Sequence, residues 1–404
     1  MKNQKAFFIL FALCFIIFSA WGSIAAEKSP VKLIGSAVLS GKVGALPSTG
    51  WGFMDAQDYI NDNGGVNGRK FKVILEDNQY EIPEAISIFN RITASEPKDE
   101  LFFHSSWQTG VLRSLAQKVK ENHMIFIDGS MASNIFNEDV KKNYPYYFSC
   151  GVPYGEQCGM IFKYINENLH KKKKKPKLAF IYIDAAAGND PLEKMRMYAE
   201  HFNFDLVLVE PVTFTTTDFT PTLMKIRKAK ADYVILWSWS VPVSTRFLKT
   251  ARPYLKNTKI FGLSYLAWEL FFHTTGEAFD GVYVVSPYPR PSEINNPLVA
   301  AMNYYVKKKD RKIKVWDLYL QGFVMSLMAS EGARRADNAG DLSRERIRDE
   351  LENLKDWDAF GMYEGKTFNY ASHQFPRARM LRADFKTKSL IPVTDWLVVD
   401  EYLK

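Results

Sequence analysis

The stretch Asn61-Asp62-Asn63-Gly64-Gly65-Val66-Asn67-Gly68-Arg69-Lys70 decides the fold of this chain. Its Asn and Gly residues supply the positive-φ positions that a tight helix-to-strand turn requires. Before it, residues 32–39 form an apolar run typical of a buried strand, and residues 51–60 have a helical pattern. After it, residues 70–76 alternate as a second strand. Pro83 then opens another helix, at the first helical position where its missing N–H is harmless.

The same alternation of strand and helix continues along most of the chain. It predicts parallel sheets covered by helices on both faces, and therefore an α/β fold with two doubly wound parallel-sheet lobes. The expected strands are 31–38, 70–76, 100–103, 124–127, 146–150, 177–183, 205–212, 232–237, 258–263 and 281–286.

Residues 1–26 have the pattern of a secretory signal peptide. Lys2 and Lys5 form a basic start, an apolar run covers residues 6–18, and the chain is expected to be cleaved near Ala25 or Ala26. The alternative is an uncleaved membrane anchor, but the run is short for a membrane span. We therefore expect an exported, periplasmic protein.

The formal net charge of +8 owes much to the run Lys171–Lys175, which lies between an expected helix and an expected strand. A solvated loop is typical there, whereas nucleic-acid binding requires basic residues spread over a face. We expect no nucleic-acid partner. After removal of the signal peptide two cysteines remain, Cys150 and Cys158, and the sequence leaves open a disulfide or two buried thiols.

The sequence shows no motif for metal binding or nucleophilic catalysis. Its six histidines are scattered, and His-x-x-x-His, Cys-x-x-Cys and Gly-x-Ser-x-Gly patterns are absent. We expect no enzyme activity, no metal and no cofactor. An exported hydrolase is the alternative, and its sign would be a Ser–His pair within hydrogen-bond reach in a cleft.

The turn at residues 61–70, with Leu39-Ser40-Gly41 before it and residues 76–85 after it, resembles the opening of the type I periplasmic solute-binding proteins. Among these it is similar to the leucine/isoleucine/valine-binding family of ABC-transporter receptors, over nearly all of residues 31–404. The resemblance implies two lobes joined by a three-strand hinge, with a ligand-binding cleft between the lobes.

The resemblance also implies where the chain passes between the lobes. The expected crossovers are Cys150–Pro153, Val285–Pro289 and Asp358–Gly365. The N-terminal lobe is then 27–150 plus 288–358, and the C-terminal lobe is 151–287 plus 359–404.

Two loops of the first lobe are expected to contact the ligand. Ser105, Ser106 and Trp107 follow one strand, and the two serines match the Ser-Ser of the family's carboxylate-binding loop. The alternative is that one serine only caps the helix that follows. Asp128 and Ser130 follow the next strand. Asp128 either caps the following turn or contacts a donor on the ligand.

The second lobe departs more from the family pattern. The family's ligand-facing Tyr corresponds to Ala187, and the Glu that pairs a ligand ammonium corresponds to Ser264. An ammonium buried without a partner costs several kcal/mol. The expected contacts on this side are Tyr154, Trp237, Trp239, Ser264 and Tyr265, and these aromatics suit a flat, apolar ligand without an amine. Cation–π contact could instead hold a cationic ligand, or some of the rings could be core.

The resemblance therefore implies a periplasmic receptor that binds a small-molecule ligand and delivers it to ABC-transporter permease subunits in the inner membrane. We expect a monomer and a carboxylate-bearing, aromatic or apolar solute. Binding of a branched-chain amino acid or a small amide is the alternative. A ligand-sensing regulator with the same fold is a further one.

Overall fold

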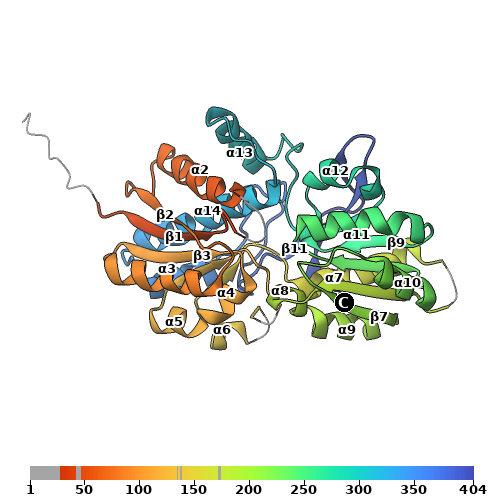
Figure 1. Cartoon of the computed structure of the whole chain (residues 1–404). Helices are drawn as coiled ribbons and strands as arrows, with labels where there is room; N and C mark the ends of the chain where they lie inside the picture. The colour runs from red at the N-terminus through yellow and green to blue at the C-terminus, as the bar shows by residue number, and fades with distance from the viewer. Residues whose placement is uncertain (1–27, 42–46, 134, 137–138, 172–173) are drawn as a thin grey trace, which may run out of the picture.

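The computed structural model describes residues 28–41, 47–133, 135–136, 139–171 and 174–404. The expected signal peptide lies outside these residues. The chain forms two α/β lobes side by side, each built around its own sheet (Figure 1). The α/β class and the doubly wound lobes agree with the sequence analysis.

The first sheet is parallel throughout, in the order β2-β1-β3-β4-β5. Its strands are β1 (Val31–Ala37), β2 (Phe71–Asp77), β3 (Leu101–Ser106), β4 (Ile125–Asp128) and β5 (Tyr147–Ser149). The helices between them are α2 (Ser48–Asp62), α3 (Ile82–Ser95), α4 (Thr109–Ser114), α5 (Ala116–Glu121) and α6 (Val140–Asn143). Three later helices, α13 (Pro297–Lys308), α14 (Trp316–Asn338) and α15 (Arg344–Glu352), return to this lobe.

The turn between α2 and β2 has the predicted chemistry. Gly64, Gly65 and Gly68 have positive φ, and so does Asn67. A Cβ at Gly65 would lie 2.1 Å from the carbonyl oxygen of Arg69, so only glycine fits. The Asn61 amide bonds to both the N–H and the carbonyl of Phe71, at 2.9 Å each, and fixes the start of β2 against the end of α2.

The second sheet has the order β12-β11-β10-β9-β8-β6-β7, and β13 pairs with β11. Its strands are β6 (Lys177–Ile183), β7 (Asp205–Val212), β8 (Tyr233–Trp237), β9 (Lys259–Gly262), β10 (Tyr283–Ser286), β11 (Arg377–Asp384), β12 (Ser389–Pro392) and β13 (Leu397–Val398). Strands β6 to β10 are parallel, whereas β11 is antiparallel to its neighbours.

The helices of the second lobe cover both faces of that sheet. They are α7 (Tyr154–Tyr164), continued by a π-helical turn η1 (Ile165–Leu169), α8 (Ala186–Asn189), α9 (Leu192–His201), α10 (Thr220–Ala229), α11 (Val241–Tyr254) and α12 (Leu270–Thr274). Short 3₁₀ turns, η2 (Ser264–Leu266) and η3 (Gly276–Phe279), and a last helix, α16 (Val399–Tyr402), complete it.

All ten predicted strands are present, each within three residues of its expected ends. Strands β11, β12 and β13 were missed. Arginines stand at three positions of β11, including both its first residue and Arg382, and they mask its apolar alternation.

The lobes are closed on each other. Val38, Trp107 and Met131 of the first lobe are buried in the hydrophobic cluster of the second lobe. Aromatic side chains after α15, among them Tyr363 and Tyr370, are buried in the cluster of the first lobe, as is Trp396. Cys150 and Cys158 are both buried and unbonded to each other, so the structure has two thiols there.

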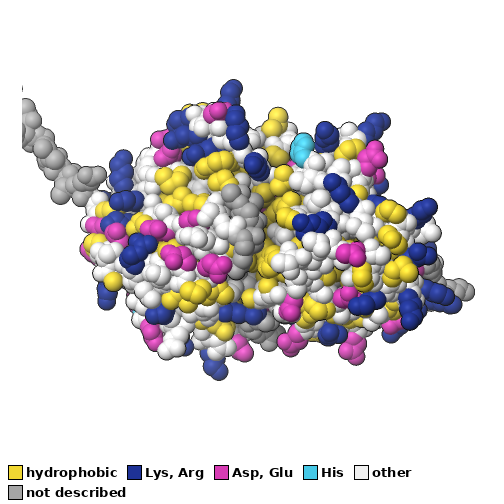
Figure 2. All heavy atoms as spheres, in the orientation of Figure 1, with side chains coloured by type: hydrophobic (Ala, Val, Ile, Leu, Met, Phe, Trp, Pro, Cys, Tyr) yellow, Lys and Arg dark blue, Asp and Glu magenta, His cyan; other side chains and the backbone are white. Residues whose placement is uncertain are grey.

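The surface carries mixed charges. Lys171, Lys174 and Lys175 are exposed. On the face drawn in Figure 2, the basic and acidic side chains are interspersed, and no large area of one sign is seen. This distribution is unlike the basic face that binds nucleic acid.

Candidate functional site

The predicted site residues lie where the carboxyl ends of the parallel strands of the two lobes meet. All of them are buried, none being more than 3% exposed. They are Ser105, Ser106, Trp107, Asp128 and Ser130 from the first lobe, and Tyr154, Trp237, Trp239, Ser264 and Tyr265 from the second. In open α/β sheets this edge is where ligands bind.

Polar atoms without partners follow strand β3. The side-chain oxygens of Ser105, Gln108 and Thr109 are buried and accept or donate no hydrogen bond among the described residues. Ser106 differs, because its Oγ accepts a 3.4 Å hydrogen bond from the backbone N–H of Gln108. A buried polar atom left unpaired costs about 1–3 kcal/mol. Such atoms are usually satisfied by a ligand or by water.

Both oxygens of the Asp128 carboxylate are hydrogen-bonded to the turn that follows β4. One oxygen accepts the backbone N–H of Ser130 at 2.7 Å, and the other accepts that of Met131 at 2.9 Å. Burial raises the pKa of Asp128 to about 7, against the lowering effect of these hydrogen bonds, and Asp190 nearby raises it further. The capping alternative of the sequence analysis is the one that these contacts favour.

A cluster of aromatic rings lies beside the polar residues that follow β3 and β4. We call Trp107, Tyr154, Trp237, Trp239 and Tyr265 the aromatic wall. Trp237 and Tyr265 are stacked with centroids 5.9 Å apart, and Tyr154 lies 4.5 Å from Trp237. Trp107 reaches over from the first lobe to within 6.0 Å of Tyr265. The wall is therefore built from both lobes.

Ser264 has its backbone N–H bonded to the Gln157 side chain at 2.9 Å. Its hydroxyl lies 3.9 Å from the sulfur of Met131, which comes from the other lobe. The position that would carry a ligand-pairing carboxylate in the resembled family is thus a small hydroxyl with a weak contact.

Direct hydrogen bonds hold the lobes together. The Tyr265 hydroxyl donates to the carbonyl of Gly129 at 3.0 Å. Asp190, just after α8 in the second lobe, accepts the backbone N–H of Ser133 at 2.6 Å and pairs with Arg113 of α4 at 2.6 Å. We call these three residues the Asp190 latch. No local pattern predicts this latch, because its members are far apart in the chain.

A buried arginine after β10 contacts residues of both lobes. Arg290, just past the predicted crossover at Val285–Pro289, pairs with Asp317 at the start of α14 and with Glu269 at 3.4 Å. It also donates to the carbonyl of Ala267 at 2.7 Å. Burial raises the pKa of Asp317 to about 7, although Arg290 lowers it in part. The sequence analysis did not predict this cluster. The one local feature that could have indicated it is the charged residue Arg290 shortly after β10.

A cavity of about 340 Å³ opens beside the aromatic wall, and we call it the outer chamber. Residues 80–83 and 108–110 of the first lobe line it, as do residues 185–187 and Phe214 of the second. It adjoins the wall through Phe214, whose ring lies 5.6 Å from that of Trp239.

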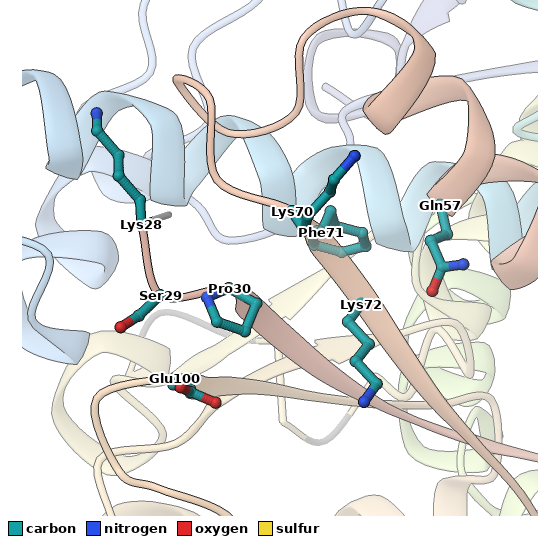
Figure 3. Close-up of a pocket in the computed structure, with 8 residues that line it drawn as sticks. All are labelled: Lys28, Ser29, Pro30, Gln57, Lys70, Phe71, Lys72 and Glu100. Carbon is teal, nitrogen blue, oxygen red and sulfur yellow. The ribbon is translucent and has the colours of Figure 1, made fainter. Parts of the chain in front are cut away.

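Another cavity, of about 510 Å³, lies elsewhere (Figure 3). It is at the amino ends of β1, β2 and β3, where Lys28, Lys70, Lys72 and Glu100 surround it. It does not touch the second lobe and is at the opposite edge of the sheet from the predicted site. We therefore place the candidate site at the cleft between the lobes.

The carboxylates placed above around the cleft all have partners within the described chain. Asp128 holds backbone amides, Asp190 belongs to the latch, and Glu269 pairs with Arg290. Glu156, on the first turn of α7, pairs with Lys194. A ligand ammonium would therefore share any of these carboxylates with a partner that is already in place.

The described residues contain no group of three or more His, Cys, Asp or Glu side chains that could hold a metal ion. None of their helices has the length and apolarity needed to cross a membrane.

Two doubly wound lobes that close on a buried cleft at their strand ends define the class of two-lobed solute-binding proteins. Comparison with known proteins agrees with this assignment. Residues 31–386 match the family model described as periplasmic binding protein. The chain belongs to that family, which is one of solute receptors and not of enzymes.

Individual relatives and solved structures show which members of the family this chain is similar to. The Leu/Ile/Val-binding protein homolog 1 of Brucella abortus is 23% identical over 287 residues, which is 70% of this chain and 73% of the relative. The branched-chain amino acid ABC transporter protein of Thermus thermophilus with bound valine has a TM-score of 0.80 at 20% identity, covering 92% of this chain and 97% of its own. Within the periplasmic binding protein family, the chain is thus similar in sequence to Leu/Ile/Val-binding proteins and in fold to a branched-chain amino acid ABC transporter protein.

Two other solved proteins with this fold are associated with different solutes. A fatty acid ABC transporter substrate-binding protein from Thermomonospora curvata has a TM-score of 0.77 at 17% identity, covering 92% of each chain. A solute-binding protein from R. palustris in complex with 4-hydroxybenzoate has a TM-score of 0.74 at 14% identity, covering 91% of this chain and 97% of its own.

Proposed function

We propose that this protein is the periplasmic receptor of an ABC importer and captures a small carboxylate-bearing solute with an aromatic or apolar body. The solute binds in the cleft between the lobes and holds them closed. Permease subunits in the inner membrane then take it from the closed receptor. The protein reaches the periplasm after cleavage near Ala25 or Ala26 and acts as a monomer.

One observation carries the choice of ligand. Unpartnered side-chain oxygens of Ser105 and Thr109 lie at the same strand edge as five buried rings, and the carboxylates placed around this edge already have partners. Hydroxyl groups bind a carboxylate without needing a charge of their own. Aromatic rings contribute apolar area and stacking to a flat body.

The residues take separate roles in this proposal. Ser105 and Ser106 bind the solute carboxylate, and Ser130 and Ser264 contribute polar contacts at its flanks. Trp107, Tyr154, Trp237, Trp239 and Tyr265 contact the body of the solute. Asp128 acts by holding the turn that carries Ser130.

A solute that contacts both lobes favours the closed form by its differential affinity for that form. The Tyr265–Gly129 hydrogen bond and the Asp190 latch exist only when the lobes meet. Closure is then the signal that the permease recognises.

A branched-chain amino acid is the second candidate, because the Thermus structure with 0.80 TM-score carries valine. For that ligand, Glu269 or Asp128 would pair the ammonium while also bonded to Arg290 or to backbone amides. The use of the same fold by a ligand-sensing regulator is a further alternative.

A thermal-shift screen tests the ligand class. Residues 27–404 are unfolded and refolded to remove carried ligand, and then assayed with benzoate, 4-hydroxybenzoate and phenylacetate against leucine, isoleucine, valine and acetamide. A ligand at a hundredfold its Kd stabilises by about 2.7 kcal/mol, which raises the Tm by a few degrees. We expect a response to the amine-free acids. A response to the amino acids alone would replace this ligand class with the second candidate.

A further inference from the structure

The outer chamber is a separate compartment of the cleft. Its volume of about 340 Å³ is comparable with small-molecule pockets, which hold roughly 300–1,000 Å³. Tyr80 of the first lobe and Phe214 of the second both line it, and their rings are in edge-to-face contact with centroids 6.3 Å apart. Tyr80 also lies 5.9 Å from Trp107, so the chamber continues directly from the aromatic wall.

Its first-lobe side offers polar groups. Gln108 and Thr109 line the chamber, are 4% and 3% exposed, and each has a side-chain oxygen with no hydrogen-bond partner among the described residues. An amide and a hydroxyl can each donate as well as accept, so they suit either an acid or a hydroxyl group on a solute.

Apart from Phe214, its second-lobe side is lined by small side chains. Ala185, Ala186 and Ala187 line it, and the carbonyl of Ala187 is held by the Trp237 indole at 2.8 Å. Gly110 of the first lobe also lines the chamber and lies close to Ala186, because a Cβ built at Gly110 would be 3.9 Å from the Cβ of Ala186, an ordinary van der Waals distance. Small residues of both lobes therefore form this wall of the chamber.

We infer that the outer chamber receives the body of the solute, and that Ala186, with its neighbours Ala185 and Ala187, determines how large that body can be. The inference rests on the proposed function. It names a narrower ligand class, namely carboxylates whose apolar body is larger than a single ring or a branched aliphatic side chain. Gln108 and Thr109 supply the polar contacts within the chamber.

The substitution Ala186→Leu tests the inference, with Ala300→Leu on the exposed face of α13 as the matched control. Unfolding of the refolded, ligand-free proteins is measured first. A leucine that enters a hollow chamber leaves the Tm near that of wild type, whereas one forced against a packed wall lowers it. Ala185→Leu is the second variant, and a lowered Tm in both variants would mean that the chamber is filled in solution, overturning the inference.

Calorimetric titration then compares two probes with the same carboxylate and different bodies, benzoate and biphenyl-4-carboxylate. We expect wild type to bind the biphenyl acid more tightly. Ala186→Leu should weaken that acid about tenfold or more while changing benzoate by no more than about twofold, because overpacking penalises only the ligand that fills the chamber. Ala300→Leu should match wild type.

The outcomes separate the two proposals. Binding of benzoate with no binding of the biphenyl acid, or equal effects of Ala186→Leu on both, would overturn the inference and leave the receptor for amine-free acids standing. Binding of leucine with neither acid would overturn both the inference and the proposed ligand class. The proposal that the protein is a receptor would stand.

Discussion

At the level of single residues, the state of each carboxylate decides which charges the cleft can accept. Asp128 lies at the end of β4, where a ligand could reach it, yet both of its oxygens hold backbone N–H groups. Under the proposed function, Asp128 can stand beside a site for acids because both of its oxygens are bonded within its own turn. A side chain used in this way contributes to the geometry of the site without contacting the ligand.

Asp128 also makes stability depend on pH. Its pKa of about 7 in the folded protein is above the unfolded value of 3.8. Between these values the folded state keeps a proton that the unfolded chain has lost, so the free energy of unfolding falls as pH rises from about 4 to about 7. Asp128→Asn should remove this part of the slope.

The measurement is urea unfolding of wild type and Asp128→Asn at several pH values across that window. The difference between the two proteins isolates Asp128, since Asp317, whose pKa is also about 7, is present in both. A difference that stays constant with pH would show that the backbone hydrogen bonds keep Asp128 ionised throughout.

Among the secondary-structure elements, three segments meet at a buried ion pair: the loop after η2, the segment after β10 and the first turn of α14. Arg290 joins all three through Ala267, Glu269 and Asp317. Removal of one member of a buried ion pair leaves an uncompensated charge, at a cost of about 3–5 kcal/mol. Asp317→Ala should therefore lower the free energy of unfolding by about that amount.

Two variants keep this expectation testable. The double substitution Arg290→Met with Asp317→Leu removes both charges and should recover most of the loss, measured by urea unfolding. Asp310→Ala breaks the exposed pair with Lys312, 2.5 Å apart, and should change stability by no more than about 1 kcal/mol. Equal losses for Asp317→Ala and Asp310→Ala would contradict a special role for the buried pair.

The elements also show what the sequence could predict. Strands β1 to β10 were predictable because each has a local signal, an apolar run between turn residues. Strand β11 was not, because its arginines hide the pattern; Arg379, for example, is covered by the Trp396 ring 4.1 Å away. Local patterns also placed the site loops at strand ends. They could not show the Asp190 latch, whose partners Arg113 and Ser133 come together only through tertiary packing.

For the whole molecule, we expect the contacts between the lobes to set an equilibrium between open and closed forms. The lobes share the aromatic wall, and Trp107 and Met131 of the first lobe are buried in the core of the second. Opening would expose these side chains and break the Asp190 latch. The apparent Kd for a ligand that binds the closed form equals its intrinsic Kd divided by the closed fraction. Residues that hold the lobes together thus set affinity without touching the ligand.

Asp190→Ala tests this coupling. The variant loses the bonds to Ser133 and Arg113, so its closed fraction should fall when no ligand is present. Small-angle scattering of the refolded, ligand-free variant should give a larger radius of gyration than wild type, and saturating ligand, using whichever probe the thermal-shift screen identifies, should restore the compact value. Calorimetry should show affinity about tenfold weaker, in line with a smaller closed fraction. Arg91→Ala, which breaks the exposed pair with Glu76 at 3.3 Å, is the control and should behave as wild type. If Asp190→Ala kept the wild-type radius both with and without ligand yet lost affinity, Asp190 would act on the ligand site directly and not through closure.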